Sequence, residues 1–377
     1  MRVLAVVFAV AWLVGSPPIS AAECPPDNRS NRDLDVSLDH PPAPIDPRCR
    51  PEADDVGGSI VLDEHLLTNA QNDRDYNGGG EIKFSGYSAL KYGHWLDLPL
   101  QWVDDQIGID RPGSKWQAAH AFAAGLLIFT PSDLAARQVV PGDRPYASLF
   151  FVSSGRRYTN PELDVAYSSS LTVGALGLAA AESVQRALHS ITGSTQPEGW
   201  SHQISDGGEP TARYSLARQA LLTQHRQSDL SLDSKWTVAG NVGTITEGSI
   251  ALSLRWGRIN SPWWAFTPEQ NTYVQETQPG PPPLDVHSRW ELFMLMGARF
   301  KLRVYNAFLE GQFRHSDLRY SSDSINHALG EAWVGIEYRN SAGIEIRYLA
   351  RWESPELRSG IGSRTIAWGS VEFAKSF

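Results

Sequence analysis

Strict alternation of apolar and charged residues near the C-terminus most narrowly limits what this chain can fold into. The clearest example is residues 331–339, where apolar side chains alternate with charged ones: Ala332, Val334, Ile336 and Tyr338 against Glu331, Glu337 and Arg339. Residues 344–351 and 370–377 repeat the pattern. Because successive side chains of a strand point to opposite faces, one face would be apolar and the other charged. This pattern favours a transmembrane β-barrel with a polar interior; a soluble β-sandwich with one solvated face is the alternative.

The composition agrees with a β-rich fold and excludes other classes. The chain has 377 residues and a formal net charge of -9, which argues against a basic nucleic-acid-binding protein. Its 32 glycines and 24 prolines suit a chain with many turns. Beyond the N-terminus, no stretch has the roughly 18 consecutive apolar residues of a membrane-spanning helix. A helical membrane protein is therefore excluded, whereas a β-barrel is not.

The N-terminal part of the sequence divides into three segments. Residues 1–22 have the basic start, short apolar core and small residues of a secretory signal peptide. Residues 23–57 are polar and rich in proline, which predicts a periplasmic arm, and residues 58–377 carry the strand pattern. Export to an oxidising compartment predicts a disulfide between Cys24 and Cys49, with two free thiols as the alternative.

Thirteen segments have strand-like sequences: 59–68, 77–90, 118–130, 146–157, 163–176, 211–223, 235–245, 249–257, 290–300, 302–315, 331–339, 343–351 and 365–377. A single-chain bacterial barrel has an even number of strands, so one segment is split or does not span the membrane. We therefore expect an all-β, antiparallel barrel of about twelve strands. The segments around 235–257 and the first segment are the least regular. Residues 91–117 and 259–288 are predicted to be loops.

One helical period stands out from the strands, at residues 179–191. Ala181, Val184, Leu188 and Ile191 fall on one apolar face, and Glu182, Gln185 and His189 fall on a neighbouring stripe. We expect this helix to lie in an extracellular loop, with its apolar face on the barrel wall and the polar stripe toward a substrate. Histidine titrates near neutral pH and suits general-base chemistry, although a surface histidine without a function has the same spacing.

Five short motifs occur in a fixed order along the chain. They are Asn72-Asp-Arg-Asp-Tyr-Asn-Gly-Gly, Phe129-Thr-Pro-Ser-Asp, Asp143-Arg-Pro-Tyr-Ala, Gln185-x-x-x-His and Gly199-Trp-x-x-Gln. Together they resemble the lipid A 3'-O-deacylase family of outer-membrane β-barrels, from about residue 59 to the C-terminus. The final strand, which ends on Phe377, also resembles the ends of bacterial outer-membrane barrels.

The resemblance implies a twelve-stranded barrel in the bacterial outer membrane, with an active site between the wall and a helix of an extracellular loop. In that family a histidine acts as general base on water, and bound calcium helps to hold the ester oxygen. The implied substrate is lipid A of lipopolysaccharide, from which an acyl chain is removed. We expect a monomer that binds no nucleic acid.

The family's motifs also imply roles for individual residues. His189 corresponds to the catalytic base, and Gln185 precedes it by one helical turn. Glu209, in a Gly-Gly-Glu-Pro run where the family has Asn-Glu-Pro, either joins the site or holds a loop. Arg144 either orients a phosphate of lipid A or forms a buried ion pair that holds a loop.

The implied calcium ligands are Asp63, Glu64 and Asn77. Asp63-Glu64 stands where the family has an Asn-Asp pair, and Asn77 stands where it has a threonine. Calcium prefers oxygen ligands, which all three residues carry. Because Asp63 and Glu64 are adjacent on a strand, they point to opposite faces, and we expect only one of them to ligate.

Two further functions remain open from the sequence. One is a structural or transport barrel without enzymatic activity, and the other is an outer-membrane phospholipase. A serine hydrolase lacks support because no Gly-x-Ser-x-Gly elbow occurs. A zinc enzyme lacks support because His189 and His202 are too far apart for a pair of ligands on one helix.

Overall fold

The computed structural model describes residues 57–64, 74–109, 116–227, 230–271, 273, 277–282, 284 and 289–376. The predicted signal peptide of residues 1–22 and the predicted arm up to residue 56 lie outside the described residues. The predicted Cys24–Cys49 disulfide lies outside them as well.

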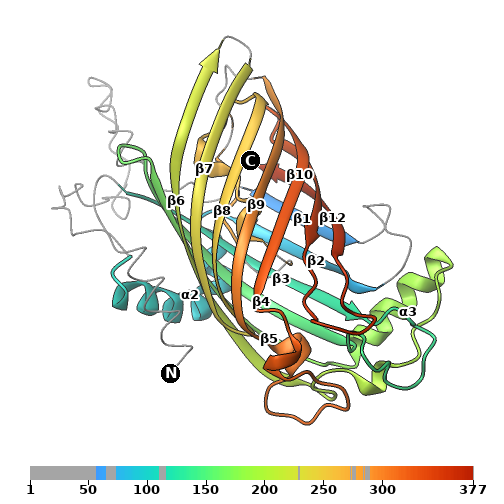
Figure 1. Ribbon diagram of the computed structural model, residues 1–377. Coiled ribbons are helices and arrows are strands. Elements are labelled where there is room, and N and C mark those ends of the chain that lie inside the picture. The colour runs from blue at the N-terminus through green and yellow to red at the C-terminus, as the bar shows by residue number, and fades with distance from the viewer. Residues whose placement is uncertain are drawn as a thin grey trace, which may run out of the picture.

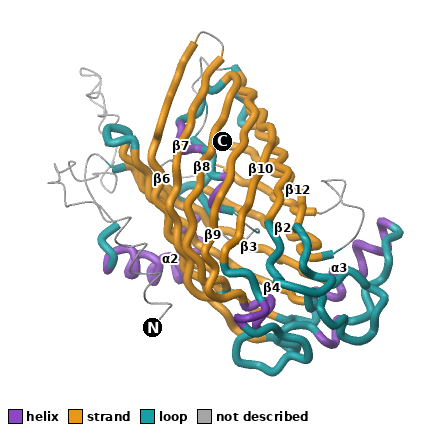
Figure 2. Tube along the Cα trace, viewed as in Figure 1, coloured by secondary structure: helices purple, strands orange, loops and turns teal. Residues whose placement is uncertain are grey.

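The described chain folds into a closed antiparallel β-barrel of twelve strands (Figures 1 and 2). The strands are β1 (Gly57–Glu64), β2 (Asp75–Ser85), β3 (Gln117–Thr130), β4 (Ala147–Asn160), β5 (Val165–Leu176), β6 (Glu209–Gln227), β7 (Leu230–Gly243), β8 (Ile245–Arg258), β9 (Trp290–Asn306), β10 (Ala328–Asn340), β11 (Ile344–Glu353) and β12 (Ile366–Ser376). Each strand pairs with the next, and β12 pairs with β1 to close the barrel. The predicted antiparallel barrel of about twelve strands is confirmed.

The error in the predicted strand count lies in β9, not in the segments that we considered least regular. The predicted segments 290–300 and 302–315 form a single strand that ends at Asn306. Lys301, which separated them in the sequence, points into the barrel and forms salt bridges with Glu331 and Glu353. A charged residue at an inward position continues the alternation instead of interrupting it.

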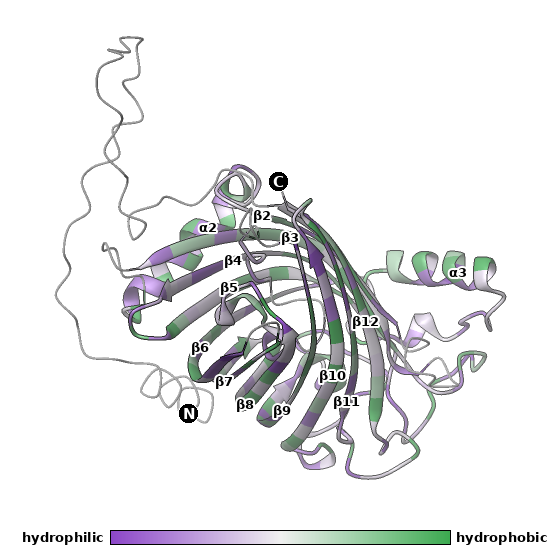
Figure 3. Cartoon of the chain, turned by 90° about the horizontal axis from the view of Figure 1, so that it is seen from above, coloured by the Kyte–Doolittle hydropathy of each residue, from purple (hydrophilic) through white to green (hydrophobic). Residues whose placement is uncertain are grey.

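The two faces of the wall have opposite polarity, as the alternation predicts. On β10, Ile336 is 46% exposed on the outer face, whereas the neighbouring Glu337 is 3% exposed inside the barrel. Figure 3 shows hydrophobic and hydrophilic bands alternating along the strands. The outer face can therefore contact lipid without burying charge in it.

Opposite charges are paired inside the barrel. Glu331 accepts hydrogen bonds from Arg299 at 2.5 Å, Lys301 at 2.9 Å and Arg351 at 2.8 Å. Glu247 pairs with Arg303 at 2.7 Å in the same way. A buried charge without a partner costs several kcal/mol, so each of these cations requires its carboxylate.

The connection between β8 and β9, predicted to be a loop, folds back into the barrel. We call its described part, within residues 259–289, the inner loop. Its Glu269 side chain accepts hydrogen bonds from Gln219 at 2.6 Å, Thr237 at 3.0 Å and Ser253 at 2.8 Å. These three residues point inward from β6, β7 and β8, so the carboxylate of Glu269 lies inside the barrel.

Other strands hold the inner loop by its backbone. Arg351 of β11 donates to the carbonyl oxygen of Pro268 at 2.6 Å, and Arg157 of β4 donates to that of Pro279 at 2.8 Å. The inner loop therefore has partners around much of the barrel circumference. It occupies space that an open channel would need for solute.

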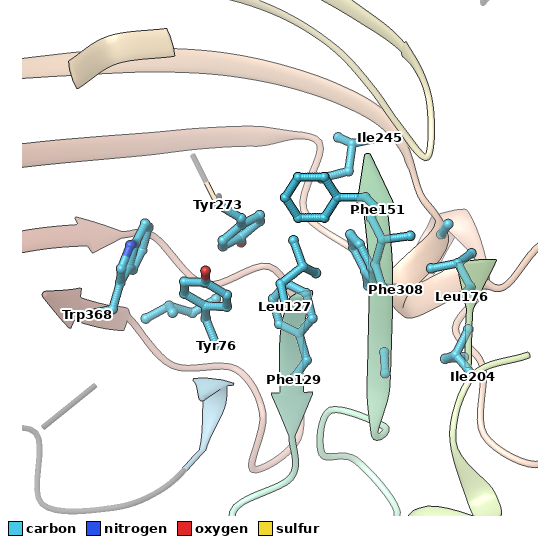
Figure 4. Close-up of a cluster of buried hydrophobic side chains, with 14 of the residues drawn as sticks. Tyr76, Leu127, Phe129, Phe151, Leu176, Ile204, Ile245, Tyr273, Phe308 and Trp368 are labelled. Carbon is cyan, nitrogen blue, oxygen red and sulfur yellow. The ribbon is translucent and has the colours of Figure 1, made fainter. Parts of the chain in front are cut away.

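An apolar cluster fills the barrel interior at the end where β3 finishes and β4 begins (Figure 4). The rings of Tyr76 and Tyr273 are 4.6 Å apart, and those of Phe129 and Phe308 are 4.7 Å apart. Tyr273 belongs to the inner loop, and Phe308 belongs to the short helix α4 (Ala307–Glu310). The interior is thus packed by side chains at this level as well.

Two longer helices lie at opposite ends of the barrel (Figure 1). Helix α2 (Ala89–Gln106) connects β2 to β3, where we predicted only a loop, and α3 (Ala180–Thr192) connects β5 to β6. Short 3₁₀ helices complete the structure: η4 (Trp200–His202), η5 (Trp263–Ala265), η6 (Pro268–Gln270) and η7 (Ser322–Ser324). Among the described helices, none combines the length and apolar character needed to cross a membrane.

Replacing Glu331 by glutamine should strongly destabilise the barrel, because Arg299, Lys301 and Arg351 would share less negative charge. We expect a loss of roughly 3–5 kcal/mol in the free energy of unfolding. The loss is measured as earlier unfolding in urea, in detergent micelles, by circular dichroism. Asp323→Asn, in an exposed loop, is the control and should change little. Equal stability of the two variants would contradict the role assigned to the interior charges.

Candidate active site

Helix α3 packs on the outer surface of the barrel. Ala181 lies in a buried cluster with Ile128, Leu134, Tyr146 and Trp200. Ile128 belongs to β3 and points outward, because the next residue, Phe129, lies in the interior cluster. The first turn of the helix therefore lies against the outside of the wall near the end of β3.

The buried face of α3 is not the one that we predicted. Three residues on it are buried: Ala181, Gln185 and His189. The other apolar residues are exposed: Val184 by 37%, Leu188 by 52% and Ile191 by 82%. We predicted that all four residues of the apolar face would pack on the barrel. This is wrong for three of them, because only Ala181 is buried. An apolar face beside a barrel in a membrane can remain outside, because lipid is an apolar solvent.

Gln185 is held in place by the loop that follows the helix. The indole Nε1–H of Trp200 donates to Oε1 of Gln185 at 2.8 Å, and the ring of Tyr146 lies 4.9 Å from that of Trp200. Because the indole can only donate, it fixes which side of the amide carries oxygen. Nε2 of Gln185 is buried and has no hydrogen-bond partner among the described residues. This N–H group can donate a hydrogen bond to a bound molecule, since buried polar groups in proteins are nearly always hydrogen-bonded.

The ring of His189 has a defined tautomer. Its Nδ1 lies 2.5 Å from the backbone carbonyl oxygen of Thr195. A carbonyl oxygen only accepts hydrogen bonds, so Nδ1 carries the proton in this contact. In the neutral ring Nε2 then carries the basic lone pair, which is the form that a general base requires.

Two of the predicted calcium ligands share the outer surface with α3. Asn77 donates through Nδ2 to Oγ1 of Thr130 at 3.3 Å. Glu64 pairs with Gly78, and Gly78 pairs with Ile128, which lies in one buried cluster with Ala181 of α3. The register therefore places Glu64 on the part of the wall where α3 begins, and the hydrogen bond to Thr130, two residues after Ile128, places Asn77 beside it.

Asp63 points the other way, into the barrel. Its carboxylate accepts a hydrogen bond from the hydroxyl of Tyr76 at 2.9 Å and another from Ser370. The two adjacent acidic residues thus lie on opposite faces of β1, as expected for neighbours on a strand. The side chain of Asp63 has no access to the outer surface, and only Glu64 of this pair remains a candidate ligand there.

Glycine at position 78 keeps room beside the carboxylate of Glu64. A Cβ added there would lie 3.4 Å from Oε2 of Glu64 and 2.6 Å from the carbonyl oxygen of Asp63. Carboxylate and amide oxygens beside the space that this glycine leaves fit a calcium ion. Among the described residues, no group of three or more acidic, histidine or cysteine side chains could hold a metal by itself. Amide and backbone oxygens or water must therefore complete such a site.

Glu209 is used to fasten two loops. Its carboxylate accepts hydrogen bonds from the backbone N–H groups of Phe313 and Arg314 and from Nε2 of Gln312, each at 2.9 Å. It thereby ties the start of β6 to the loop between β9 and β10. Of the two roles left open for Glu209, the geometry favours holding a loop.

Arg144 lies inside the mouth of the barrel, whereas α3 lies outside. Its guanidinium stacks 4.1 Å above the ring of Phe129 and forms a salt bridge with Glu356. This buried ion pair joins the loop before β4 to the loop before β12. Arg144 faces away from the site beside α3, which disfavours the predicted contact with a phosphate of lipid A.

The neighbouring Asp143 fastens the same two loops. Burial alone would raise the pKa of its carboxyl, but hydrogen bonds from Ser132 and from the backbone of Arg144, together with the Arg364 guanidinium, hold the pKa below its usual value. This ionised carboxylate stabilises the loops at neutral pH and loses its contribution as the pH falls through the lowered pKa.

Two parts of the site carry no signal in the sequence. Thr195 contributes a backbone carbonyl, which every residue has, and Thr130 reaches Asn77 only through strand pairing. A large cavity of about 1440 Å³, at the end of the barrel that carries α3, is lined by residues such as Phe151, Thr211 and Tyr320, and by none of the predicted site residues. Its lining offers no histidine, so we place the candidate active site beside α3 and not in this cavity.

Comparisons with known proteins identify similar chains. A family model described as outer membrane protein LpxR matches residues 52–377. The structure is similar to LpxR from Salmonella typhimurium, with a TM-score of 0.63 and 13% sequence identity over 85% of this chain and 100% of that chain. At that identity the likeness shows the fold alone. Among curated protein sequences there is no match.

Two other barrels are less similar. The β domain of the Bordetella autotransporter BrkA has a TM-score of 0.41 and 9% identity, over 86% of this chain and 100% of that chain. An outer membrane channel from Pseudomonas putida has a TM-score of 0.43 and 8% identity, over 92% and 100%. We draw no functional conclusion from either.

Replacing Trp200 by phenylalanine should loosen α3 without unfolding the barrel, because only the hydrogen bond to Gln185 is lost. One such bond contributes about 1 kcal/mol, so amide hydrogen exchange in residues 180–192 should become roughly five times faster. Exchange is measured by mass spectrometry in detergent micelles. Ser183→Ala, on the exposed side of α3, should leave the rates unchanged. Unchanged rates in the Trp200 variant would contradict its role in fixing Gln185.

Proposed function

The chain belongs to the LpxR family of outer membrane proteins, and we propose that it hydrolyses a 3'-linked acyloxyacyl ester of lipid A. The products are a free fatty acid and a lipid A with fewer acyl chains. The observation that carries this proposal is the placement of His189, buried within the loop that carries α3, with its Nδ1 proton directed to the Thr195 carbonyl. Family membership supports a barrel of the lipid A deacylase type; the roles of individual residues are our proposal.

In the proposed reaction, Nε2 of His189 accepts a proton from a water molecule while the water oxygen attacks the ester carbonyl carbon. The protonated ring then gives that proton to the sugar or hydroxyacyl oxygen as its bond to the carbonyl carbon breaks. The Thr195 carbonyl, which accepts from Nδ1–H, keeps the ring oriented and stabilises its charged form. General-base assistance of this kind contributes about 10²–10⁴ in rate.

Gln185 is proposed to stabilise the negative charge that develops on the ester oxygen. Its Nε2 is buried, is fixed as a donor by Trp200 and lies one helical turn before His189 on the same face. A preoriented donor of this kind is worth about 10²–10³ in rate in other hydrolases.

Calcium would be held by the carboxylate of Glu64 and the amide oxygen of Asn77, together with other oxygen atoms. When bound, it would supply positive charge beside the ester carbonyl. The support is the pair of oxygen-bearing side chains on the outer surface and the space that Gly78 leaves beside Glu64. Asp63, whose carboxylate lies inside the barrel, is not part of this proposal.

The position of the site suits a substrate that stays in the membrane. A site on the outside of the wall can be reached sideways from the lipid, without passage through the barrel. The inner loop and the apolar cluster occupy the interior, which argues against transport as the alternative function. A phospholipase would use the same catalytic groups, so only a comparison of substrates separates it from a lipid A deacylase.

His189→Ala should lower the rate of acyl release from lipid A at least 10²-fold, because the general base is lost. The full chain is purified in detergent micelles, and the released fatty acid and the shortened lipid A are measured by mass spectrometry. His202→Ala is the matched control, since His202 lies on the same loop but is held by Asp317 at 2.5 Å. It should retain wild-type activity. Equal activity of the His189 variant and the wild type would remove His189 from the mechanism.

A chelator should abolish activity, and added calcium should restore it better than magnesium. Calcium accepts irregular sets of oxygen ligands, whereas magnesium requires near-octahedral geometry. Glu64→Gln should raise the calcium concentration needed for half-maximal rate, and Glu182→Gln, whose side chain pairs with Arg186, should not. Activity that is insensitive to the chelator would contradict the metal while leaving His189 in place. Release from phospholipid but not from lipid A would favour the phospholipase.

A further inference from the structure

Helix α2 lies on the outside of the barrel, like α3, but at the other end. Its Asp97 accepts two hydrogen bonds from the guanidinium of Arg156 in β4, at 2.7 Å and 2.5 Å. The neighbouring Arg157 points inward to the inner loop, so Arg156 points outward. An arginine on the lipid face of a barrel is unfavourable without a counter-charge, and α2 supplies that charge.

A second acidic residue of α2 covers more polar groups on the same outer surface. Asp104 accepts hydrogen bonds from the hydroxyl of Ser169 in β5 at 2.5 Å and from that of Tyr214 in β6 at 2.9 Å. Asp97 and Asp104 are both buried, by contact with the wall. The side of α2 that carries Asp97 and Asp104, together with the buried Leu96 and Leu100, is thus the side that packs on the protein.

The opposite side of α2 is exposed and rich in aromatic residues. Tyr92 is 63% exposed, Trp95 58%, Leu98 52% and Trp102 64%. At 100° per residue these four side chains fall within one half of the helix, away from Asp97 and Asp104. Tryptophan and tyrosine are the residues that gather where a bilayer meets water, because one part of each ring system is apolar and another is polar.

The exposed side of α2 continues the lipid-facing surface of the barrel. The ring of Tyr92 lies 5.9 Å from that of Phe84 on β2. Phe84 is 48% exposed and Ile82, two residues earlier on the same outer face, is 53% exposed. The apolar band of β2 therefore runs directly onto the helix.

The lengths of the strand connections assign α2 to the periplasmic side. At the end of the barrel that carries α2, three of the five connections are only two to four residues long, namely 161–164, 228–229 and 341–343, and the other two are the connection with α2 and the inner loop, which folds into the barrel. At the end that carries α3 most connections are longer, including 131–146, 177–208, 307–327 and 354–365, although β7 and β8 are joined by residue 244 alone. In outer-membrane barrels the short turns are periplasmic and the long loops extracellular.

We propose that α2 is an interfacial helix that inserts Tyr92, Trp95, Leu98 and Trp102 into the periplasmic leaflet, where they bind phospholipid at the boundary between head groups and acyl chains. The occupant is a lipid surface and not a second copy of the chain, because the helix extends a wall that already faces lipid. In this role α2 both neutralises Arg156 and anchors the barrel at a fixed depth in the membrane.

The test is fluorescence quenching by lipid and by water-soluble quencher. The full chain and the double variant Trp95→Phe/Trp102→Phe are reconstituted into phosphatidylcholine vesicles, with and without lipids brominated near the carbonyl end of their acyl chains. Phenylalanine keeps the ring and the apolar character, so the variant should fold. Trp368→Phe, which removes an indole inside the barrel, is the control.

If α2 lies in the bilayer, the double variant loses emission that brominated lipid quenches, and its quenching by aqueous iodide stays at the wild-type level. The control variant should lose none of the lipid-quenched emission. A loss of iodide-quenched emission in the double variant would place α2 in water and overturn the proposal. If the double variant loses neither lipid-quenched nor iodide-quenched emission, and crosslinking yields dimers in the vesicles, another copy of the chain covers the helix. That result would overturn the proposal as well.

Discussion

Charge pairing inside a closed wall is the constraint on which the rest of the structure depends. The outer face must be apolar because lipid offers no hydrogen bonds, and alternation along the strands then sends the polar residues inward. Buried carboxylates such as Glu331 and Glu353 are stable only with cations around them. The inner loop completes this interior. Its Glu269 pairs with Lys235, and its backbone carbonyl oxygens accept hydrogen bonds from arginines of the wall such as Arg351.

The same constraint changes the usual amphipathic rule for both long helices. In water, a helix buries its apolar side and exposes its polar side. Here α3 buries Gln185 and His189 beside Ala181, and α2 buries Asp97 and Asp104 beside Leu96 and Leu100, while both helices also expose large apolar residues. Beside a membrane, the protein surface is the place where polar groups find partners. A histidine such as His189 can therefore be held by a loop outside the barrel, on the side of the wall that faces lipid.

The sequence predicted the architecture well and the site only in part. Alternation in residues 331–339 and 344–351 identified the barrel, because a period of two puts the apolar residues of a strand on one face and the charged residues on the other. The ordered motifs identified the family, while the roles that they imply for His189, Gln185 and Asn77 stay predictions. Helix α2 was missed because Pro99 interrupts its pattern and its exposed aromatic residues obscure an amphipathic period. The position of Arg144 could not be predicted, because its partner Glu356 is distant in sequence.

What the sequence determined by itself is which residues face lipid, because the direction of a side chain on a strand follows from its parity along the chain. That rule alone places Asp63 and Glu64 on opposite faces of their strand. The tertiary structure decided which side of α3 is buried and which nitrogen of His189 carries the proton. It also decided that the connection between β8 and β9 fills the barrel. These features depend on contacts between segments far apart in the chain, and on backbone carbonyls such as that of Thr195, which residue identity does not encode.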